Sequence, residues 1–472
     1  MGLKFGTSGL RGLSVDLEGR PAAVYATAFA RHLVRSGQAK TGDPVLVGRD
    51  FRDSSPGIAS IVIGALSRAG FVPLDCATVP TPALALYGLS LKAASLMVTG
   101  SHIPADRNGI KFYRPDGEID KADEQAIAAI AADIAEIDEA PGVAEDRSAE
   151  CAALFRTRNV SVLPENALAG LRIGIYQHST VARDLMVDIL AHYGAETVAL
   201  GRSETFIPVD TEAVSPETVG LLGQWTREHG LDAIVSADGD GDRPLLSDET
   251  GTPLRGDLLG LVTARFLAAE VVATPVTSNS GIEANGRFRV VRTRVGSPYV
   301  IAAMTEALAD GKSGVMGFEA NGGLLLGSPF TVNGRTLAPL PTRDSILPLL
   351  ATLYAAAAEK KPLSAVAASF RLPAAAADRL ENYPLEKSGA LMAYLRASRA
   401  NLETFLASLG TVAEVSDIDG LRVSLRDGST VHFRPSGNAP EMRCYVEAAT
   451  EEDAHILLEK GLALLRNFSA AP

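Results

Sequence analysis

Three aspartates alternate with glycines in the segment DGDGDR, residues 238–243, directly after a short apolar run. Three carboxylates forced into one turn repel each other, and each pair about 4 Å apart costs on the order of 4 kcal/mol at an effective dielectric constant of about 20. A divalent cation removes this repulsion, and a set of oxygen ligands suits Mg²⁺ or Ca²⁺. The segment therefore predicts a metal site formed by Asp238, Asp240 and Asp242.

Two other interpretations of this segment stay open. The first is an EF-hand, because Glu249 stands at the twelfth position counted from Asp238. The sixth position, however, is Arg243 rather than the glycine that an EF-hand turn requires, and the flanking residues read as strands. The second is a polar turn that holds no ion, although three aspartates in five residues followed by an arginine are unusual for a turn.

A second candidate is Ser101, which follows the apolar run 96–98 in the sequence TGSHIP and precedes Lys111 by ten residues. No Ser-His-Asp arrangement and no G-x-S-x-G motif accompanies it, so nothing nearby marks it as an acyl nucleophile. Mg²⁺ held by a few carboxylates usually takes a phosphate oxygen as a further ligand. We therefore expect Ser101 to carry a phosphoryl group that the metal binds. The alternative is a turn in which Ser101 and His102 cap backbone groups.

Two further loops carry groups that suit a sugar phosphate. RPSGNAPEMR, residues 434–443, supplies two arginines, a hydroxyl and a Gly-Asn turn, which together make a phosphate clamp. In the stretch 315–327, Glu319 and Asn321 are two residues apart on a glycine-rich loop, so an acid and an amide can bracket neighbouring sugar hydroxyls. The alternatives are an ordinary arginine-containing surface loop and a structural turn, respectively.

The elements that must hold these loops follow one pattern three times. Residues 44–76, 171–200 and 271–293 each read strand, turn, helix, glycine, strand. The glycines expected to end the helices are Gly70, Gly194 and Gly286. Such units build parallel sheets covered by helices, so we expect three related mixed α/β domains.

The C-terminal part reads differently and predicts a small α+β domain. Residues 373–409 look helical or irregular, and Thr450 is expected to cap a final amphipathic helix. Short strands are expected around residues 411–415, 421–425 and 431–433. The expected domains, which carry the serine, metal, sugar and phosphate loops in turn, are residues 1–150, 151–255, 256–372 and 373–472.

The totals exclude several classes of protein. The chain has 472 residues and a net charge of −12, which makes it a poor candidate for a general binder of nucleic acid or anionic membranes. Its three cysteines are far apart and form no zinc pattern or disulfide framework, as expected in a reducing cytosol. The N-terminal sequence lacks the apolar core of a signal peptide, and charges interrupt the longest apolar region, 258–276. We expect a cytoplasmic protein without a membrane span.

Taken together, the motifs resemble those of the α-D-phosphohexomutase superfamily, and within it the bacterial phosphomannomutase/phosphoglucomutase group. Residues 99–104 match the family's T-A-S-H-N-P loop at four of six positions, and residues 238–243 match its D-G-D-x-D-R loop. FGTSGLRG, residues 5–12, is similar to the family's N-terminal motif, and this similarity places Arg11 near the active serine.

Two motifs match the family more loosely. Residues 317–321 correspond to the G-E-x-S sugar loop, with Phe318 inserted and Asn321 where serine is common. Residues 434–440 and Arg443 correspond to the R-x-S-G-T-E-P phosphate loop and its later arginine, with Asn-Ala in place of Thr-Glu. Because these departures fall at sugar and phosphate contacts, they bear on substrate preference and not on reaction class.

The resemblance implies a fold of three related mixed α/β domains plus a C-terminal α+β domain around a central active-site cleft. It implies a mutase that interconverts hexose 1-phosphate and hexose 6-phosphate, with mannose as the preferred sugar and glucose as a second. The implied route runs through phosphorylated Ser101 and a hexose 1,6-bisphosphate intermediate. The implied cofactors are Mg²⁺ and the bisphosphate as activator. The expected partner is a small-molecule sugar phosphate, and the expected state is a monomer or homodimer.

The resemblance also assigns roles to residues. The implied catalytic residues are Ser101, His102, Lys111, Arg11 and Arg243. Within this set, Lys111 would act as base and His102 as a supporting acid or phosphate contact, the alternative being loop capping and a solvated charge. The implied substrate-binding residues are Glu319, Asn321, Arg434, Ser436, Gly437, Asn438 and Arg443. The implied metal ligands are Ser101, Asp238, Asp240 and Asp242. Further candidates for substrate contact are Arg294, Ser297 and Tyr299, whereas Arg49 and Arg52 are interpreted as structural.

Three other functions stay open: a phosphoglucosamine mutase, a metal-dependent sugar-phosphate phosphohydrolase, and a non-catalytic Ca²⁺-binding or scaffold protein. The serine and metal loops fit a hydrolase equally well, because water could take the phosphate from Ser101. A hydrolase, however, needs no separate clamp for a second phosphate. Arg243 and the phosphate loop disfavour the Ca²⁺-binding protein.

Overall fold

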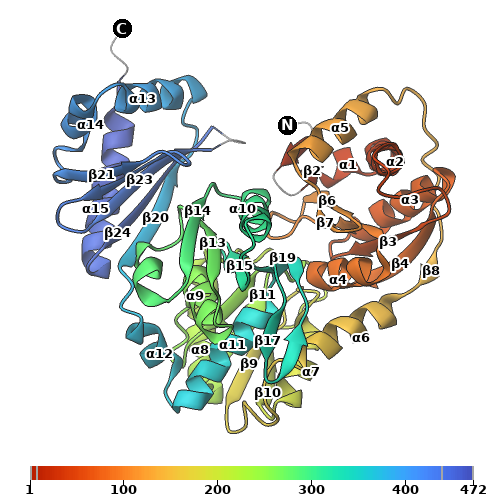
Figure 1. Cartoon of the computed structure of the whole chain (residues 1–472), viewed down its shortest axis with the longest axis horizontal. Coiled ribbons are helices and arrows are strands. Elements are labelled where there is room, and N and C mark those ends of the chain that lie inside the picture. Colours follow the sequence, from red (N-terminus) through yellow and green to blue (C-terminus); the bar gives the residue numbers. More distant parts are fainter. Residues whose placement is uncertain (1–2, 7–8, 437–439, 470–472) are drawn as a thin grey trace. The chain divides into compact units, whose positions relative to one another are not determined.

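The computed structural model describes residues 3–6, 9–436 and 440–469. The chain forms two compact units, and Figure 1 labels their helices and strands where there is room. Unit 1 comprises residues 1–273, 287–289 and 296–369. Unit 2 comprises residues 274–286, 290–295 and 370–472.

The first sheet of unit 1 has the strand order β1-β2-β6-β5-β3-β4-β8, with β7 paired to β6. Strands β3, β4 and β5 run parallel, whereas β6 is antiparallel to both β5 and β2. The strands are β1 (Lys4–Gly6), β2 (Gly9–Leu13), β3 (Pro44–Arg49), β4 (Val72–Thr78), β5 (Ala94–Val98), β6 (Arg107–Arg114), β7 (Gly117–Glu118) and β8 (Glu145–Asp146). The helices are α1 (Ser14–Leu17), α2 (Arg20–Arg35), α3 (Ser55–Arg68), α4 (Thr81–Leu91), α5 (Lys121–Ala132) and α6 (Ser148–Asn159).

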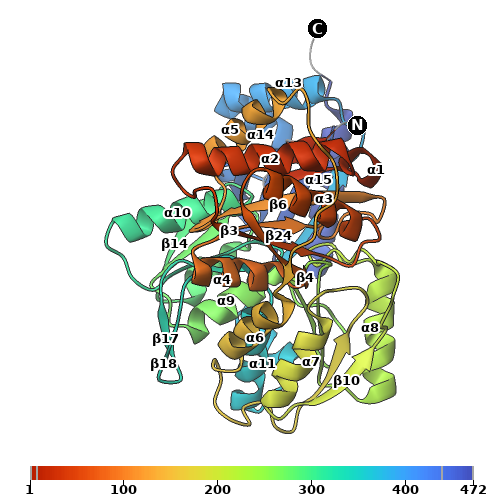
Figure 2. The same cartoon turned by 90° about the vertical axis from the view of Figure 1, so that its right-hand side faces the viewer.

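Helices cover this sheet on both faces, which explains why its parallel strands are nearly continuous apolar runs. Helices α2, α3 and α5 pack together, and α4 packs against α6 (Figure 2). Val45 and Val47 of β3 join the core under α2 and α3, and every residue of β5 is buried. The loop that leaves β5 therefore starts from a rigid strand.

The second sheet has the order β10-β9-β11-β12, in which only β12 is antiparallel to its neighbour. Its elements are β9 (Arg172–Tyr176), α7 (Arg183–His192), β10 (Glu196–Leu200), α8 (Pro216–His229), β11 (Ala233–Ala237) and β12 (Pro244–Ser247). The third sheet contains the path β13-β15-β16-β19, beside the hairpin β17-β18. The strands are β13 (Val271–Pro275), β15 (Val315–Phe318), β16 (Leu324–Leu326), β17 (Phe330–Val332), β18 (Arg335–Leu337) and β19 (Leu340–Asp344). The helices are α9 (Gly256–Phe266), α10 (Ser297–Ala309), α11 (Ile346–Glu359) and α12 (Leu363–Ser369).

Unit 2 is built on an antiparallel sheet of order β20-β24-β23-β22-β21. Its strands are β20 (Ala374–Leu380), β21 (Val412–Ser416), β22 (Leu421–Leu425), β23 (Thr430–Pro435) and β24 (Met442–Ala448). Its helices are α13 (Leu385–Ala397), α14 (Arg399–Leu406) and α15 (Glu451–Asn467), which lie beside the sheet in Figure 1. Helix α15 begins after Thr450, whose hydroxyl accepts from the backbone N–H of Asp453 as predicted. Together the four sheets confirm three α/β domains followed by an α+β domain.

Two expectations about local structure were wrong. In the first two repeats the helices end before Gly70 and Gly194, which have φ values of +88° and +84°. The third repeat instead holds the 3-10 helix η1 (Ser280–Asn285), followed by strand β14 (Arg289–Thr293). This helix ends directly before Gly286 as expected, but it is a single short 3-10 segment with one buried apolar side chain, and Gly286 has extended backbone, with φ of −149°.

The second error concerns residues 374–380, which were expected to be helical or irregular and form strand β20. Their alanine-rich sequence, AAAADRL, favours a helix by intrinsic propensity. All seven residues nevertheless pair in register with β24, so the sheet overrides the local preference. The rest of the stretch forms α13 and α14 as predicted.

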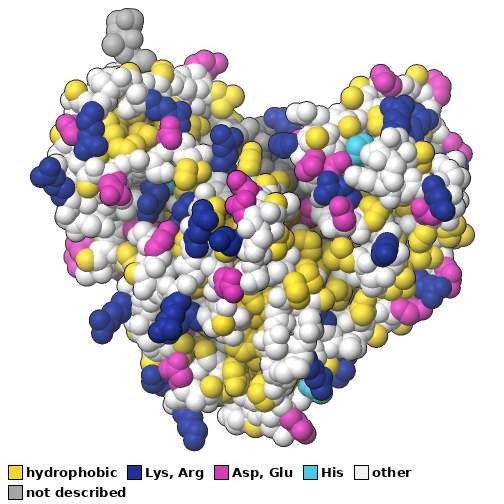
Figure 3. Space-filling view, viewed as in Figure 1, with side chains coloured by type: hydrophobic (Ala, Val, Ile, Leu, Met, Phe, Trp, Pro, Cys, Tyr) yellow, Lys and Arg dark blue, Asp and Glu magenta, His cyan; other side chains and the backbone are white. Residues whose placement is uncertain are grey.

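The surface carries both signs of charge. On the face drawn in Figure 3, lysine and arginine side chains are interspersed with aspartate and glutamate. Within the described ranges, none of the helices combines the length and apolar character that crossing a membrane requires.

Two glycines in helices of unit 1 should respond oppositely to substitution by alanine. A Cβ at Gly64 of α3 would lie 2.3 Å from the carbonyl oxygen of Ala140, so backbone must move. A Cβ at Gly220 of α8 meets nothing within 4 Å. We expect Gly64→Ala to destabilise the protein by about 1–3 kcal/mol, as overpacking does. Gly220→Ala should stabilise it by about 0.5–1 kcal/mol through helix propensity. Urea unfolding midpoints followed by circular dichroism measure both, and equal effects would contradict the prediction.

Candidate active site

Ser101 lies in the loop that joins β5 to β6. The two strands are antiparallel neighbours in which Met97 pairs with Lys111. The loop therefore reverses the chain direction, and Lys111 lies close to the loop that carries Ser101. Ser101 has no exposed surface, and its backbone is left-handed, with φ of +55°. Its Oγ donates a hydrogen bond to Asp238 Oδ2 at 2.5 Å. The structure thus brings the predicted serine directly against the predicted metal loop.

The metal loop leaves β11 and returns as β12. Asp238, Asp240 and Asp242 are completely buried, and one oxygen from each carboxylate lies within 4.8 Å of the others. The glycines are needed for this packing, because a Cβ at Gly239 would lie 2.7 Å from the carbonyl oxygen of Ser101. Gly241 has φ of +70°, a conformation that favours glycine.

The donor set of this loop fits a divalent cation. Asp240 Oδ1 and Asp242 Oδ1 are buried and have no hydrogen-bond partner in the part of the chain that the structure describes. Burial, followed by the charges of Asp240 and Asp242, raises the pKa of Asp238, so its ionised form is costly without a nearby cation. Three buried carboxylates, two of which keep an oxygen without a hydrogen bond, are the kind of ligands that Mg²⁺ and Ca²⁺ take.

Three cationic side chains already contact the triad, and one of them, Arg243, has its Nε 3.7 Å from Asp242 Oδ1. Lys111 Nζ donates to Asp240 Oδ2 and Asp242 Oδ2, each at 2.5 Å. Arg343, on β19, donates to Asp242 Oδ2 from Nε at 3.0 Å and from Nη2 at 2.9 Å. Burial opposes ionisation of Asp242, but Arg343 and then Lys111 hold its pKa well below the usual range. The carboxylate of Asp242 is therefore charged throughout the neutral pH range.

His102 is held beside Ser101 by Arg243. Arg243 Nη1 lies 2.8 Å from His102 Nδ1, and Ser101 Oγ lies 3.3 Å from the same nitrogen. A guanidinium has no acceptor, so His102 Nδ1 accepts this bond and the ring proton sits on Nε2. Burial and then the charge of Arg243 lower the pKa of His102 far below neutrality. A neutral ring of this tautomer can donate a contact through Nε2 but has no proton to give at Nδ1.

Arg11 lies on β2, the neighbour of β6, and is half-buried. Burial, followed by the charges of Arg243 and Arg343, lowers the pKa of Arg11 to about 10, which leaves it charged at neutral pH. The charges of Asp240 and Asp242 act on it in the opposite direction. The structure thus brings Arg11 to the same charged cluster as the serine and metal loops.

The sugar-loop residues follow β15 and join this cluster through Arg343. Glu319 and Asn321 are nearly buried, and Arg343 Nη1 donates to Glu319 Oε2 at 3.1 Å. Asn321 Oδ1 accepts from the N–H of Gly323 at 2.9 Å, which fixes the turn. One guanidinium therefore connects the metal loop to the sugar loop.

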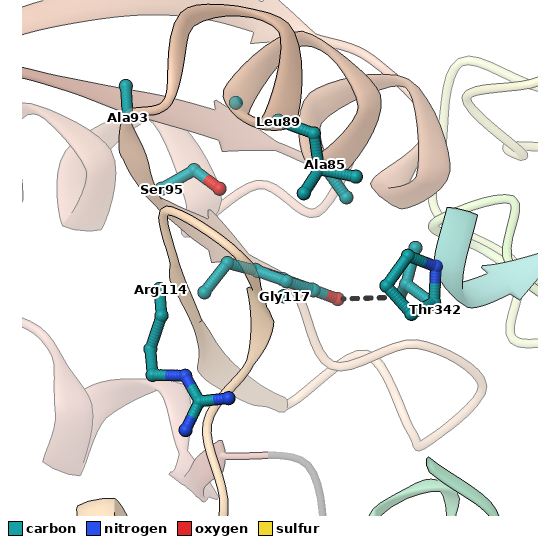
Figure 4. A pocket seen from close by; sticks show the side chains of 10 residues that line it. Ala85, Leu89, Ala93, Ser95, Arg114, Gly117 and Thr342 are labelled. Carbon is teal, nitrogen blue, oxygen red and sulfur yellow. Dashed lines mark hydrogen bonds between the residues drawn. The ribbon is translucent and has the colours of Figure 1, made fainter. Parts of the chain in front are cut away.

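A buried glutamate secures the strand that carries Arg343. Glu118 of β7 accepts from Ser297 Oγ and from Thr342 Oγ1, each at 2.8 Å. Figure 4 shows Thr342 at a small pocket that Ser95 also lines, with its 3.5 Å hydrogen bond to Tyr113 as a dashed line. Ser297, a candidate for substrate contact, thus has a structural partner in Glu118.

The phosphate-loop residues lie in unit 2, on β23 and β24. Arg434 and Arg443 are direct cross-strand partners, so both guanidiniums start from the same face of the sheet. Arg379 of β20 pairs with Arg443 on its other side and completes a row of three arginines. Like charges directly opposite each other repel, and an anion relieves that repulsion.

Acidic side chains contact each arginine of this row, and Arg379 donates to Glu381 Oε1 from Nε and Nη2 at 3.2 Å. Arg434 Nε donates to Asp419 Oδ2 at 2.8 Å, and Arg443 Nη2 lies 3.5 Å from Glu441 Oε2. The backbone N–H of Ser436 donates to the carbonyl of Glu441 at 2.9 Å, and this bond joins the end of β23 to the start of β24. Gly437 and Asn438, also predicted in this loop, lie outside the described residues.

Sequence reasoning missed Arg343 and underestimated Arg52. Arg343 lies on the short strand β19, of sequence LPTRD, and an arginine within a strand next to apolar segments was the weak signal that could have found it. Arg52, interpreted as structural, is buried and donates to the carbonyl oxygen of Ser101 at 3.0 Å. Both act through contacts far along the chain, which no local motif reveals.

Comparisons with known proteins agree with this arrangement. Models of the phosphoglucomutase/phosphomannomutase family match the chain in four parts: alpha/beta/alpha domain I at residues 2–138, domain II at 153–251, domain III at 255–372 and the C-terminal domain at 385–460. A phosphomannomutase from Sinorhizobium fredii is 58% identical over 471 residues, covering 99% of both chains. One from Salmonella muenchen is 40% identical over 472 residues, covering 99% of this chain and 96% of its own.

The fold has a solved counterpart. The crystal structure of a phosphoglucomutase/phosphomannomutase family protein from Burkholderia thailandensis superposes with a TM-score of 0.77 over 98% of each chain, at 20% identity. At that identity the likeness concerns the fold alone. The four family models and the full-length relatives decide the assignment, and the chain belongs to the phosphoglucomutase/phosphomannomutase family.

Proposed function

We propose that this chain is a phosphohexomutase that interconverts hexose 1-phosphate and hexose 6-phosphate, with mannose phosphates as preferred substrates. The observation that carries the proposal is the buried Ser101 hydroxyl, 2.5 Å from an aspartate of a triad that suits a metal ion. A serine in that place can carry a phosphoryl group whose charge is offset locally. The enzyme is thus an isomerase that works by intramolecular phosphoryl exchange.

In the proposed reaction, Ser101 begins as a phosphoserine. The 6-hydroxyl oxygen of a hexose 1-phosphate attacks the phosphorus, the bond from phosphorus to Ser101 Oγ breaks, and the hydroxyl proton leaves O6. The product of this half-reaction is hexose 1,6-bisphosphate. After the intermediate reverses its orientation, Ser101 Oγ attacks the phosphate at C1 and the bond to O1 breaks, which yields hexose 6-phosphate and regenerates phosphoserine. No water is consumed, and the phosphoryl count is conserved.

This chain's residues would position the transferring group and manage the proton. A divalent cation held by Ser101, Asp238, Asp240 and Asp242 would supply electrostatic stabilisation of the transferring phosphoryl group. Arg11 and Arg243 would steady the same group, and His102 would contact it through Nε2–H. Lys111 is the proposed base. Its Nζ contacts Asp240 and Asp242, which holds it beside the metal loop.

The remaining loops would hold the parts of the substrate that do not react. Arg434, Ser436 and Arg443, together with Gly437 and Asn438, would bind the second phosphate. The cross-strand arginine pair supports this role, because two like charges on one face favour an anion. Such a clamp favours a mutase over a phosphohydrolase, which needs no place for a second phosphate.

Glu319 and Asn321 would read the hydroxyls at C3 and C4 of the sugar. We propose mannose rather than glucosamine phosphates as substrates, because the relatives named phosphomannomutase are 58% and 40% identical to this chain. The relatives named phosphoglucosamine mutase are 31% and 29% identical. We further propose that hexose 1,6-bisphosphate serves as activator and that the enzyme works in the cytoplasm as a monomer or homodimer. Its free, buried cysteines suit a reducing compartment.

With Mg²⁺ and a trace of bisphosphate, the wild type should convert mannose 1-phosphate faster than glucose or glucosamine 1-phosphate. Ser101→Ala should lose nearly all of this activity with an unchanged circular dichroism spectrum, because the atom that carries the phosphoryl group is gone. Intact-mass analysis should show partial phosphorylation of the wild type that maps to Ser101. An unphosphorylated wild type together with an active Ser101→Ala variant would rule out the phosphoserine.

Asp240→Asn should raise the Mg²⁺ concentration for half-maximal activity by at least about tenfold, because one of three anionic ligands is lost. Excess Mg²⁺ should restore activity only in part. Ca²⁺ should bind yet support poor turnover, since its looser coordination positions a phosphate less tightly. The control is Asp116→Asn, at an exposed surface position. Full activity of the wild type in EDTA would contradict the metal assignment.

Arg443→Ala separates a mutase from a hydrolase. Loss of one charge-assisted contact should cost roughly 2–4 kcal/mol, or about thirty- to a thousandfold in kcat/KM. The intermediate should also escape more readily, so added hexose 1,6-bisphosphate should restore part of the rate. Arg426→Ala, at an exposed position of the same unit, is the control. Release of inorganic phosphate should stay far below isomerisation in every variant, and free phosphate as the main product would establish the hydrolase instead.

A further inference from the structure

The loop that carries Ser101 rests on one buried arginine. The side chain of Arg52, just beyond β3, has no exposed surface, and its Nε donates to Asp50 Oδ2 at 3.1 Å. The four remaining N–H groups donate to backbone carbonyls of the loop, namely those of Ser101 at 3.0 Å, Ile103 at 2.6 Å, Pro104 at 2.6 Å and Arg107 at 2.9 Å. A guanidinium has five N–H donors, so Asp50 and this loop use all of them.

Asp50 holds the same loop from its other end. Its carboxylate accepts from Thr99 Oγ1 at 2.7 Å and from Ser55 Oγ at 2.5 Å. Thr99 Oγ1 in turn accepts from the backbone N–H of Ser101 at 2.8 Å. A hydroxyl has a single hydrogen, so the bond that Thr99 donates to Asp50 fixes its acceptor role toward Ser101.

These contacts fix both backbone polar groups of Ser101. Its N–H is bound by Thr99 and its C=O by Arg52, while its φ of +55° lies in a region that non-glycine residues seldom adopt. Such a conformation persists only where the surroundings determine it. Gly100 allows the close approach, because a Cβ there would lie 2.7 Å from Cζ of Arg52.

A side chain of the neighbouring α/β domain packs against the same guanidinium. The Arg52 Cζ lies 3.9 Å from the centroid of the Phe206 ring, which comes from the segment after β10. A Cβ on Gly239 of the metal loop would lie 2.7 Å from the Ser101 carbonyl oxygen and 2.8 Å from that ring. Arg52 therefore supports Ser101 at the place where the serine loop meets the metal loop.

We propose that Arg52 and Asp50 are positioning residues that align Ser101 Oγ for phosphoryl transfer by holding the backbone of its loop. The proposal rests on the proposed function of Ser101. Neither side chain contacts Ser101 Oγ, so their effect passes through the backbone N–H and C=O of Ser101. Phosphoryl transfer depends on alignment, and a displacement of about 1 Å can cost about a hundredfold in rate. A loss of alignment lowers kcat and leaves the binding of hexose 1-phosphate largely intact.

The test compares Thr99→Val with Thr99→Ser in the full-length enzyme with Mg²⁺, mannose 1-phosphate and hexose 1,6-bisphosphate. Valine removes the hydroxyl that connects Asp50 to Ser101, whereas serine keeps it. We expect Thr99→Val to lower kcat by about tenfold or more, with KM within about threefold of the wild type. Thr99→Ser should recover most of the lost kcat. Intact mass should show Thr99→Val gaining phosphate from the bisphosphate more slowly, in step with its kcat.

Arg52→Lys provides a second, independent variant, because lysine keeps the charge but cannot reach four carbonyls at once. The control is Arg49→Met on β3, where Arg49 is partly exposed and pairs with Asp75 at 3.4 Å. If Arg52→Lys does not fold, the two Thr99 variants still decide the question. An unchanged kcat per folded molecule in Thr99→Val, whatever its melting temperature, would overturn the positioning role. A wild type that neither isomerises nor carries phosphate would overturn the proposed function instead, so the two failures are distinguishable.

Discussion

The candidate site depends on one constraint, which is that the charges of its buried side chains must balance each other. The three aspartates of residues 238–242 have no exposed surface, and a buried charge is very costly unless an opposite charge accompanies it. Lys111, Arg243 and Arg343 supply that charge from β6, from the metal loop itself and from β19. Because each group is buried by the others, removing any one leaves an unpaired charge in a low-dielectric region, and the cluster stands as a unit.

This cluster explains why the three α/β sheets of unit 1 share one design. In each, a parallel strand ends in a loop of the candidate site, and the chain returns as an antiparallel strand: β5 to β6, β11 to β12, and β15 to β16. The loops carry Ser101, the three aspartates and Glu319. Ligands of open α/β sheets bind beyond the carboxyl ends of their strands. The antiparallel return adds cations to that edge, since Lys111 lies on the strand that follows the serine loop.

The sequence predicted those site residues whose chemistry is visible within one short segment. It did not predict residues that reach the site through contacts between distant segments. The aspartate triad and Ser101 were predictable because their chemistry is spelled out by adjacent residues. Arg343 contacts Asp242 across 101 positions, and Arg52 contacts the Ser101 carbonyl across 49, so neither belongs to a local pattern. Strand β20 was missed for a related reason, because its alanines favour a helix until β24 pairs with them.

The two candidate sites would hold a phosphate group in different ways. In unit 1 the three buried carboxylates would hold a cation, and a phosphoryl group would be held through that cation's charge. In unit 2 the row of Arg379, Arg443 and Arg434 would bind a phosphate directly. Asp419, Glu441 and Glu381 lower the repulsion within this row and orient its arginines. A reaction that exchanges two phosphates on one sugar needs one site that labilises a phosphoryl group and another that only holds one. In the proposed function, the loop of Ser101 beside the aspartates would serve the first need and the arginine row would serve the second.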